Sequence, residues 1–296
     1  KTMKKIGFIG VGIMGKSMVK NLMKAGFELH IYARTKSKVE DVIGEGAQFH
    51  ESIKDCVQDC DAVITIVGFP QDVEEVYFDE GNILDSAKEG AYLIDMTTTS
   101  PQIAEKIYEE GTKRGFHVMD APVTGGDTGA KAGTLSILVG GEKEDYEACM
   151  PLFEAMGTNI NYQGKAGCGQ HCKLANQIMI AGTLSGVCEA LTYAKEQGLD
   201  PEVFMKSVAT GAAGSKQLDT FGPKILKDDY APGFFMKHFI KDMKLALIEA
   251  NRKGLSLDVL SMVLANYEEL EQEGYGDLGT QALMKFYDEE HRNTEE

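Results

Sequence analysis

The sequence predicts an α/β protein with two domains, a mostly parallel sheet covered by helices followed by an all-helical domain. Two observations carry this prediction. Over the first 165 residues, short apolar runs alternate with amphipathic stretches, which is the pattern of repeated β-α-β units. From about residue 168 onward no convincing strand remains. We therefore expect an α/β domain over residues 1–165 and a helical domain over residues 166–296.

Six strands are expected in the first domain, because six runs are short, apolar and rich in β-branched residues. They are KIGFIG (5–10), ELHIYA (28–33), AVITIVG (62–68), AYLIDM (91–96), HVMDAP (117–122) and LSILVGG (135–141). The helical stretches between them include 15–25, 36–44, 71–77, 101–114 and 143–156. The second domain opens with a long buried helix over 168–195. The helices that follow end at glycines, over 200–211, 234–254 and 258–274.

The composition excludes several classes of partner. Thirty basic and 46 acidic residues give a formal net charge of −16, which disfavours nucleic acid and anionic membranes. The six cysteines lack the spacing of a disulfide framework, so we expect free thiols in a reducing compartment. The basic start and apolar run superficially resemble a signal peptide, but the run is interrupted by glycines and lacks a small-residue cleavage site. The 15 uncharged residues after Lys173 fall short of the roughly 20 that span a bilayer. We expect a cytoplasmic protein.

A glycine pattern directly follows the first expected strand. Gly10-x-Gly12-x-x-Gly15 joins that strand to the start of a helix. Glycine permits a tight turn at the first position, close approach of backbone amides to a pyrophosphate at the second, and close helix–strand packing at the third. Glycine-rich turns are common, but the strand–turn–helix context favours dinucleotide binding over a plain turn.

The end of the second expected strand indicates which dinucleotide binds. NAD sites usually place a carboxylate there, which accepts a hydrogen bond from the ribose 2′-hydroxyl. This strand ends instead in ARTKSK, without a carboxylate. Arg34 suits a 2′-phosphate, with Thr35 and either Lys36 or Lys38 nearby, so we expect NADP rather than NAD. The alternative is that these basic residues are solvent-exposed at the start of a helix and bind no phosphate.

Two further segments are candidates for the substrate site. In DAPVTGG (120–126), a threonine and two glycines offer a hydroxyl and uncrowded backbone amides that suit a carboxylate, although a plain glycine turn fits equally well. In GCGQHCKLANQ, Lys173, Asn176 and Gln177 lie at i, i+3 and i+4 and share one helix face. A lysine is rarely buried without a partner or a task, and a snorkelling or capping lysine is the alternative. Lys241 is a second candidate for the same site.

Cys168, His171 and Cys172 resemble a metal-binding cluster. Three ligands would need a fourth protein group or a water, and no matching cluster of cysteine or histidine occurs elsewhere in the sequence. We therefore expect no metal, and favour two core thiols and a structural histidine.

Four motifs resemble, in order, those of the β-hydroxyacid dehydrogenases, which include 3-hydroxyisobutyrate dehydrogenase and tartronate semialdehyde reductase. They are GFIGVGIMG, DAPVTGG, GCGQHCKLANQ and KDMKLA. The resemblance implies an N-terminal Rossmann domain, an all-α C-terminal domain and an active site to which both contribute. It implies an NADP-dependent oxidoreductase that transfers a hydride between the nicotinamide and a small β-hydroxy acid or semialdehyde.

The resemblance also implies roles for single residues. Lys173 is the catalytic acid/base, and Asn176 and Gln177 orient the substrate, with Asn176 counted among the catalytic residues. The substrate carboxylate is bound by Thr124, Gly125 and Gly126. The cofactor is bound by Gly10, Gly12, Ile13, Met14, Gly15, Arg34, Thr35, Lys38, Val67, Gly68, Val73, Thr97, Thr98 and Lys241.

Two positions depart from the family pattern. Thr124 stands where serine is common, which keeps the hydroxyl but narrows the pocket. The segment VGFPQD lacks the usual Leu-Pro pair, which leaves the roles of Val67 and Gly68 open. The length excludes 6-phosphogluconate dehydrogenase, and Lys173 argues against imine reductases.

Several alternatives stay open at this stage. The substrate could be 3-hydroxyisobutyrate or tartronate semialdehyde, with glyoxylate or succinic semialdehyde as the second choice. A non-catalytic NADP-binding regulator is the rival from another class, but it would have no need of Lys173 and its amide neighbours. We also expect a homodimer or homotetramer, because the small-residue helix 178–188 and the apolar C-terminal helices offer more apolar surface than one domain buries.

Overall fold

The computed structural model of this chain describes residues 2–288. The chain divides into two units, Lys1–Lys173 and Leu174–Glu296. This division falls inside α10 (Cys168–Glu196), whereas the sequence places the boundary just before that helix. The α/β fold class and the helical second half are both confirmed.

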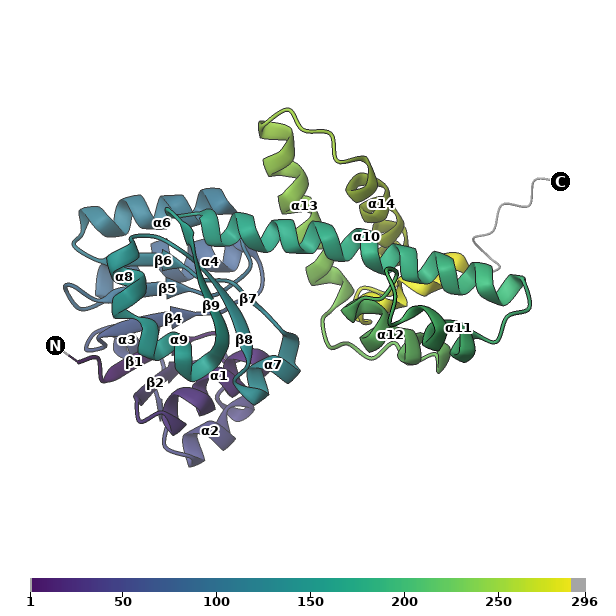
Figure 1. Cartoon of the computed structure of the whole chain (residues 1–296). Coiled ribbons are helices and arrows are strands. Elements are labelled where there is room, and N and C mark those ends of the chain that lie inside the picture. The colour runs from purple at the N-terminus through teal and green to yellow at the C-terminus, as the bar shows by residue number, and fades with distance from the viewer. Residues whose placement is uncertain (1, 289–296) are drawn as a thin grey trace. The chain divides into compact units, whose positions relative to one another are not determined.

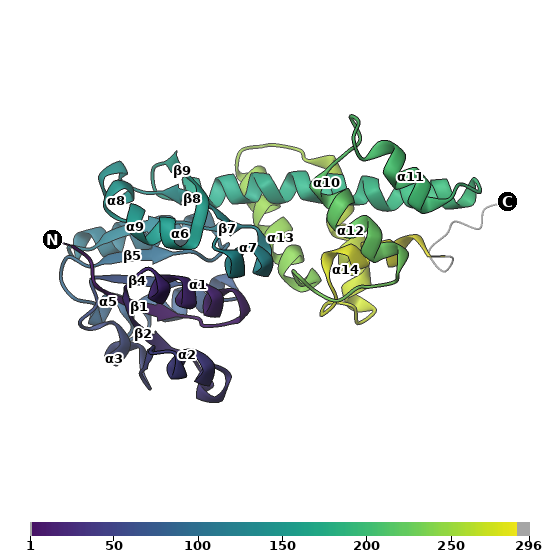
Figure 2. The same ribbon diagram turned by 60° about the horizontal axis from the view of Figure 1, so that its bottom comes forward.

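The first unit is built on one sheet with helices on its two faces (Figures 1 and 2). Within residues 2–288 the sheet has nine strands in the order β3-β2-β1-β4-β5-β6-β8-β7, and β9 pairs with β8. The strands are β1 (Lys5–Ile9), β2 (Glu28–Tyr32), β3 (Gln48–Phe49), β4 (Ala62–Thr65), β5 (Tyr92–Asp95), β6 (His117–Asp120), β7 (Val123–Thr124), β8 (Leu135–Gly140) and β9 (Gly157–Gly164). The first six are parallel, while β8 is antiparallel to β6 and β7. The strand order reverses between β1 and β4, which is where Rossmann sheets bind their ligands.

Two hydrophobic cores cover the sheet, one on each face. Successive strand residues alternate between them, as Val63 and Ile64 of β4 do, because side chains along a strand point to opposite faces. One core includes Met18 of α1, and the other includes Ile107 of α6 and Val73 of α4. Val73, predicted as a cofactor contact, has no exposed surface and packs α4 against the sheet. The helices of this unit are α1 (Ile13–Lys24), α2 (Glu40–Gly44), α3 (Ile53–Val57), α4 (Pro70–Phe78), α5 (Ile83–Ser86), α6 (Pro101–Lys113), α7 (Gly126–Ala132), α8 (Lys143–Ala148) and α9 (Met150–Met156), with a 3₁₀ turn at Lys36–Lys38.

The structure corrects the expected elements in several places. The helix expected over 36–44 is a 3₁₀ turn followed by α2, and a helix at Lys216–Leu226 was not expected. The structure adds β3, β7 and β9 to the six expected strands. β9 was absent from the expectation because its sequence, GTNINYQG, is polar, and only its first residue is buried. The single helix expected over 143–156 is two helices, α8 and α9, because Pro151 cannot donate the hydrogen bond that would continue α8 and instead occupies the first turn of α9.

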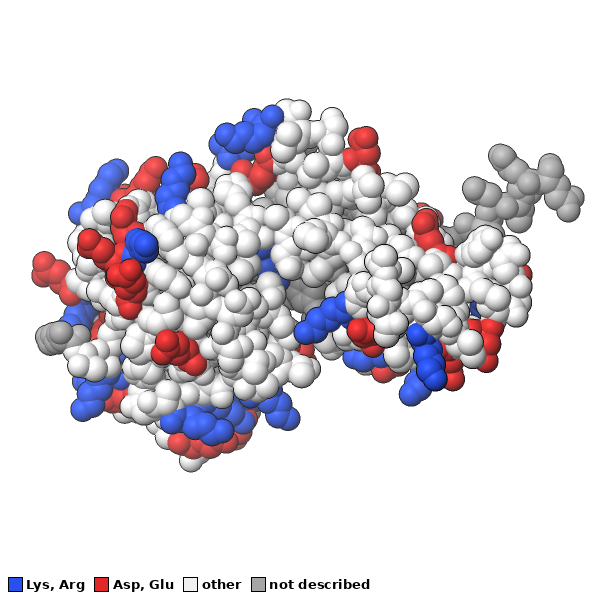
Figure 3. Space-filling model, viewed as in Figure 1, with Lys and Arg blue, Asp and Glu red and all other residues white. Residues whose placement is uncertain are grey.

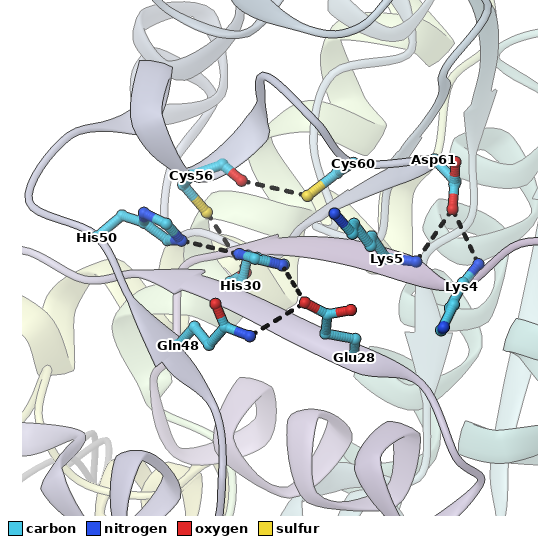
Figure 4. A network of polar contacts seen from close by, with 9 residues as sticks. All are labelled: Lys4, Lys5, Glu28, His30, Gln48, His50, Cys56, Cys60 and Asp61. Atoms are coloured by element: carbon cyan, nitrogen blue, oxygen red, sulfur yellow. Dashed lines mark hydrogen bonds and ion pairs between the residues drawn. The ribbon is translucent and has the colours of Figure 1, made fainter.

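Polar side chains tie the strands together on the side of the sheet that carries α3 (Figure 4). One oxygen of Asp61, just before β4, accepts hydrogen bonds from the backbone amides of Lys4 (2.9 Å) and Lys5 (3.0 Å). Partial burial alone would raise the pKa of Asp61. The two amides and the Lys88 ammonium have the larger combined effect and lower this pKa to about 2. The carboxylate therefore stays ionised and joins β1 to β4 at their amino ends, away from the ends at which ligands bind.

Ion pairs join α1 to α2. Lys16 lies 3.1 Å from a carboxylate oxygen of Asp41, and Lys20 lies 3.4 Å from the other oxygen and 3.6 Å from Glu45. Figure 3 shows adjacent blue and red groups at the edge of the first unit where α2 lies. Charges of opposite sign therefore balance at this edge.

The described residues of the second unit form helices joined by loops, with one isolated β-bridge between Phe235 and Gly279. Its helices are the rest of α10, α11 (Pro201–Val208), α12 (Lys216–Leu226), α13 (Met236–Arg252) and α14 (Asp258–Gln272), with a 3₁₀ helix at Thr280–Tyr287. Among residues 2–288, α10 is the one helix long and apolar enough to cross a membrane. However, Leu184, Cys188 and Leu191 of α10 are buried in the core of this unit, as in the core helix of a globular domain.

Candidate active site

The glycine turn after β1 is crowded at two positions and open at the third. A Cβ atom at Gly10 would lie 2.0 Å from the carbonyl oxygen of Ile66, and one at Gly15 would lie 2.4 Å from the carbonyl oxygen of Gly10. A Cβ atom at Gly12 would meet nothing within 4 Å. Gly12 is also the N-cap of α1, so the helix N-terminus opens onto free space that suits a pyrophosphate. The two residues after it are exposed or half-buried, namely Ile13 and Met14.

The exposed basic residues expected to select the cofactor follow β2. Arg34, Thr35 and Lys38 are all exposed. The Arg34 side chain is 76% exposed and lies 3.6 Å from Asp72 and 3.8 Å from Glu75 of α4. Such long, solvated ion pairs contribute at most about 1 kcal/mol. The guanidinium therefore loses little if it turns toward a phosphate.

The loops after β4 and β5 are tied to each other. The backbone amide of Val67 donates to the hydroxyl of Thr97 (2.9 Å), and the amide of Thr97 donates to Asp95 (3.1 Å). Thr97 is buried, whereas Thr98 and Gly68 are half-buried. The predicted cofactor residues of both loops therefore lie together at the carboxyl ends of neighbouring strands, and Thr97 holds the two loops in place.

Two buried carboxylates end β5 and β6. Asp95 and Asp120 are aligned in register and are 2% and 3% exposed. Burial raises the pKa of both groups, that of Asp95 to about 6, and the Asp120 charge adds to the rise at Asp95. Sequence reasoning passes over both residues. The available signal was an aspartate at the end of two successive apolar runs, AYLID and HVMD.

Asp120 anchors the start of α10. Its two carboxylate oxygens accept hydrogen bonds from the backbone amides of Gly167 and Gln170, each at 2.9 Å. The helix start lies so close to the sheet that a Cβ atom at Gly169 would be 2.4 Å from the carbonyl oxygen of Leu138. Glycine at this position lets the first turn of α10 rest directly on β6 and β8.

Lys173 lies one turn into α10 and is 8% exposed. Asn176 and Gln177 follow on the same helix, as the i, i+3, i+4 spacing predicts. The Asn176 amide donates to the side-chain oxygen of Gln177 (2.8 Å), and Gln177 is 3% exposed. The three polar side chains are therefore grouped at the start of an otherwise apolar helix.

A buried carboxylate that the sequence pattern did not reveal links Gln177 to Lys241. Asp242 of α13 has no exposed surface; it accepts a hydrogen bond from the Gln177 amide (2.9 Å) and lies 2.8 Å from the Lys241 ammonium. The structure thus brings two predicted site residues of the second unit together through Asp242. The signal in the sequence was a carboxylate next to lysine in KDMKLA, in the middle of an amphipathic helix.

The loop that follows β7 has the backbone form expected for an anion cradle. Gly125 and Gly126 have φ angles of +127° and +63°, which side-chain-bearing residues rarely adopt. A Cβ atom at Gly126 would meet nothing within 4 Å. Thr124 is half-buried beside them. The backbone here is accessible to a ligand.

The cysteine and histidine residues near Lys173 lie at i, i+3 and i+4 in the first turns of α10. His171 is exposed, while Cys168 and Cys172 are half-buried. Burial raises the pKa of the Cys172 thiol, although the Lys173 charge opposes this. Within residues 2–288 no three side chains of His, Cys, Asp or Glu are grouped so as to hold a metal ion.

Comparisons with known proteins agree with this arrangement. Residues 5–164 match the NAD binding domain of 6-phosphogluconate dehydrogenase, and residues 167–287 match the NAD-binding family of NADP-dependent 3-hydroxyisobutyrate dehydrogenase. A relative from Arabidopsis thaliana, named a probable mitochondrial 3-hydroxyisobutyrate dehydrogenase-like protein, is 45% identical over 95% of this chain and 84% of its own length.

The chain belongs to the β-hydroxyacid dehydrogenase family. This dehydrogenase is also 50% identical to the uncharacterized oxidoreductase YkwC of Bacillus subtilis, over 96% of this chain and 99% of that protein. A solved structure of 3-hydroxyisobutyrate dehydrogenase from Mycobacterium tuberculosis with L-serine is similar, with a TM-score of 0.89 and 26% identity, covering 97% of this chain and all of that one. The enzyme is an oxidoreductase with an NAD(P)-binding domain.

Gly12→Ala should separate cofactor binding from folding. Because the added methyl group meets no protein atom, Tm should stay at the wild-type value. The same methyl group would occupy the space of the pyrophosphate, so the affinity for NAD(P)H should fall at least about tenfold, or about 1.4 kcal/mol. Fluorescence titration measures the affinity. Gly44→Ala, on α2 and equally unobstructed, is the control and should change neither quantity. Unchanged affinity in Gly12→Ala would contradict the assigned phosphate position.

Proposed function

We propose that the enzyme is an NADP-dependent dehydrogenase or reductase that interconverts a small β-hydroxy acid and its semialdehyde, of the 3-hydroxyisobutyrate or tartronate semialdehyde type. The observation that carries the proposal is a buried lysine, Lys173, on a helix whose start is fixed by Asp120. Asn176 and Gln177 follow it on α10. A lysine in such a place supplies a proton that the reaction can use.

The chain's own residues supply the acid–base part of the reaction. NADP, when bound, supplies or accepts the hydride. During reduction, negative charge develops on the carbonyl oxygen of the substrate. The Lys173 ammonium stabilises this charge and donates its proton to the oxygen, and in the reverse direction neutral Lys173 accepts the proton from the hydroxyl. Asn176 and Gln177 orient the substrate by hydrogen bonds.

The substrate carboxylate is assigned to the loop after β7. The accessible amides of Gly125 and Gly126 and the hydroxyl of Thr124 are donors suited to an anion. A β-hydroxy acid carries its hydroxyl one carbon beyond the carbon that bears the carboxylate. One end can therefore be held by the loop while Lys173 acts on the other. L-serine, which accompanies the Mycobacterium tuberculosis enzyme in its solved structure, has the same relation of hydroxyl to carboxylate.

We also propose a preference for NADP over NAD. The support is the exposed Arg34 after β2, with Thr35 and Lys38 exposed beside it and no carboxylate at the strand end. A guanidinium binds a phosphate through two charge-assisted hydrogen bonds. Arg34 and Lys38 are therefore assigned to the 2′-phosphate. The cytoplasmic location stays a prediction.

Lys173→Ala should lower kcat by roughly 10²–10⁴-fold, which is the usual contribution of a positioned acid/base. Lys173→Arg should fail nearly as badly, because guanidinium keeps the charge but does not release its proton near neutral pH. Cofactor affinity should remain near the wild-type value in both variants. The assay follows NADPH absorbance with each candidate semialdehyde. Lys195→Ala, exposed near the end of the same helix, is the control. Near-normal turnover by Lys173→Arg would show that the lysine is not the acid/base.

Arg34→Asp should reverse the ratio of kcat/KM between NADPH and NADH. Most of the change should be a lower kcat/KM with NADPH. The increase in kcat/KM with NADH should be small, because Asp72 and Glu75 already lie beside this position and the variant adds a third carboxylate. Lys54→Asp makes the same charge change on α3 and should leave the ratio unaltered. The proposal of NADP preference is wrong if the wild-type enzyme binds NADH more tightly than NADPH.

We propose that two copies of the chain, or four, assemble through the helical unit. Met179 of α10 and Val259 and Met262 of α14 are 73%, 58% and 57% exposed. Gly182 of α10 lies against Val259, so these side chains belong to one apolar face. Sedimentation at micromolar concentration should show a dimer or tetramer, and Val259→Glu with Met262→Glu should dissociate it. Val203→Glu, at an exposed apolar position of α11, is the control. A wild-type monomer would refute this proposal.

A further inference from the structure

One buried side chain links the helix of Lys173 to the loop after β5. Gln170 has no exposed surface. Its side-chain oxygen accepts a hydrogen bond from the backbone amide of Thr99 (2.9 Å), and its side-chain nitrogen donates to the carbonyl oxygen of Thr97 (2.7 Å). Both halves of the amide are therefore used, each by the backbone of the same loop.

The backbone of Gln170 is fixed as firmly as its side chain. Its amide donates to Asp120, which also holds Gly167. The residue is thus bound to the end of β6 through its backbone and to the loop after β5 through its side chain. These two attachments fix the first turn of α10 in position and also in rotation about the helix axis.

The loop that Gln170 holds contains predicted cofactor residues. Thr97 is further tied to Asp95 and to the amide of Val67, so a hydrogen bond also joins this loop to the loop after β4. Lys173 lies three residues after Gln170, on the neighbouring turn of the same helix face. Gln170 therefore connects the helical turn that precedes Lys173 to the loop expected beside the nicotinamide.

We infer that Gln170 is a positioning residue of the reaction, which sets the placement of Lys173 relative to the loop 97–99. The inference rests on the proposed function of Lys173. Its physical basis is the matched pair of hydrogen bonds. Asparagine is too short to reach both groups, and glutamate lacks the donor for Thr97 when ionised. A small displacement of a catalytic group is enough to slow a reaction strongly.

Gln170→Met keeps the length of the side chain and removes both hydrogen bonds. It should lower kcat by about 10- to 100-fold while KM and cofactor affinity stay near their wild-type values. Gln281→Met is the matched control: Gln281 is equally buried and donates to the carbonyl oxygens of Asp229 and Ala231 in the helical unit. The control should lose a similar amount of thermal stability but retain kcat.

Gln170→Glu tests the same contact with an isosteric side chain. The introduced carboxylate repels the carbonyl oxygen of Thr97, whereas its protonated form can donate to that oxygen and still accept from Thr99. Three carboxylates lie on neighbouring groups and favour the protonated form: Asp120 accepts from the Gln170 backbone amide, Asp95 accepts from the Thr97 amide, and Glu105 lies beside Gly167. Lys173, three residues later on the helix, opposes it. The ratio of variant to wild-type kcat should therefore rise about fivefold or more between about pH 8 and about pH 5.5.

Lys173→Ala, assayed beside these variants, distinguishes a failure of the acid/base role of Lys173 from a failure of the positioning role of Gln170. Near-normal turnover by Lys173→Ala would overturn the proposed acid/base. If Lys173→Ala is inactive but a folded Gln170→Met keeps its kcat, only the positioning role is wrong. If Gln170→Met does not fold, a pH-independent kcat ratio for Gln170→Glu overturns that role instead. Loss of kcat in Gln170→Met, with its recovery at low pH in Gln170→Glu, supports it.

Discussion

The rest of the site depends on the contact between Asp120 and the first turn of α10. A buried carboxylate is costly, but here backbone amides donate to both of its oxygens and the positive end of the helix dipole faces it. Because a helix is stiff, fixing its first turn fixes the direction of the side chains that follow. The strand that ends at Asp120 therefore determines where Lys173 points, and the sheet of the NAD(P)-binding domain also orients the proposed acid/base.

Much of the fold was predictable, because its parallel strands are buried on both faces and are therefore written as continuous apolar runs. Five of the six expected strands are of this kind, whereas β8 is antiparallel to its neighbours β6 and β7. The helices were predictable from the glycines that follow them. β9 lies outside the rule: it pairs with β8 alone, alternates between exposed and half-buried residues, and is stabilised by backbone hydrogen bonds that leave no apolar signal. β7 is a two-residue pairing inside a loop, and its partner is decided only when the chain has folded.

The candidate site was predictable where its residues are neighbours in sequence. Gly10, Gly12 and Gly15 form one turn, and Lys173 and Gln177 are one helical turn apart. The contacts that hold these groups in place were not predictable, because they join distant segments. Gln170 meets Thr99 across 71 residues, and Gln177 meets Asp242 across 65. No local spacing rule relates such pairs, so a glutamine among helical residues gave no sign of its partners.

The continuity of α10 across the two units restricts how this chain can change in length. Each residue of an α-helix turns the chain by about 100° and advances it by about 1.5 Å. If one residue were inserted after Lys173, Lys173 would no longer share a helix face with Asn176 and Gln177. No single substitution elsewhere would bring the three side chains back onto one face. This segment is therefore constrained in its number of residues as well as in the residues at positions such as Gly169. A largely exposed loop, such as the one between α11 and α12, carries no such constraint on its length.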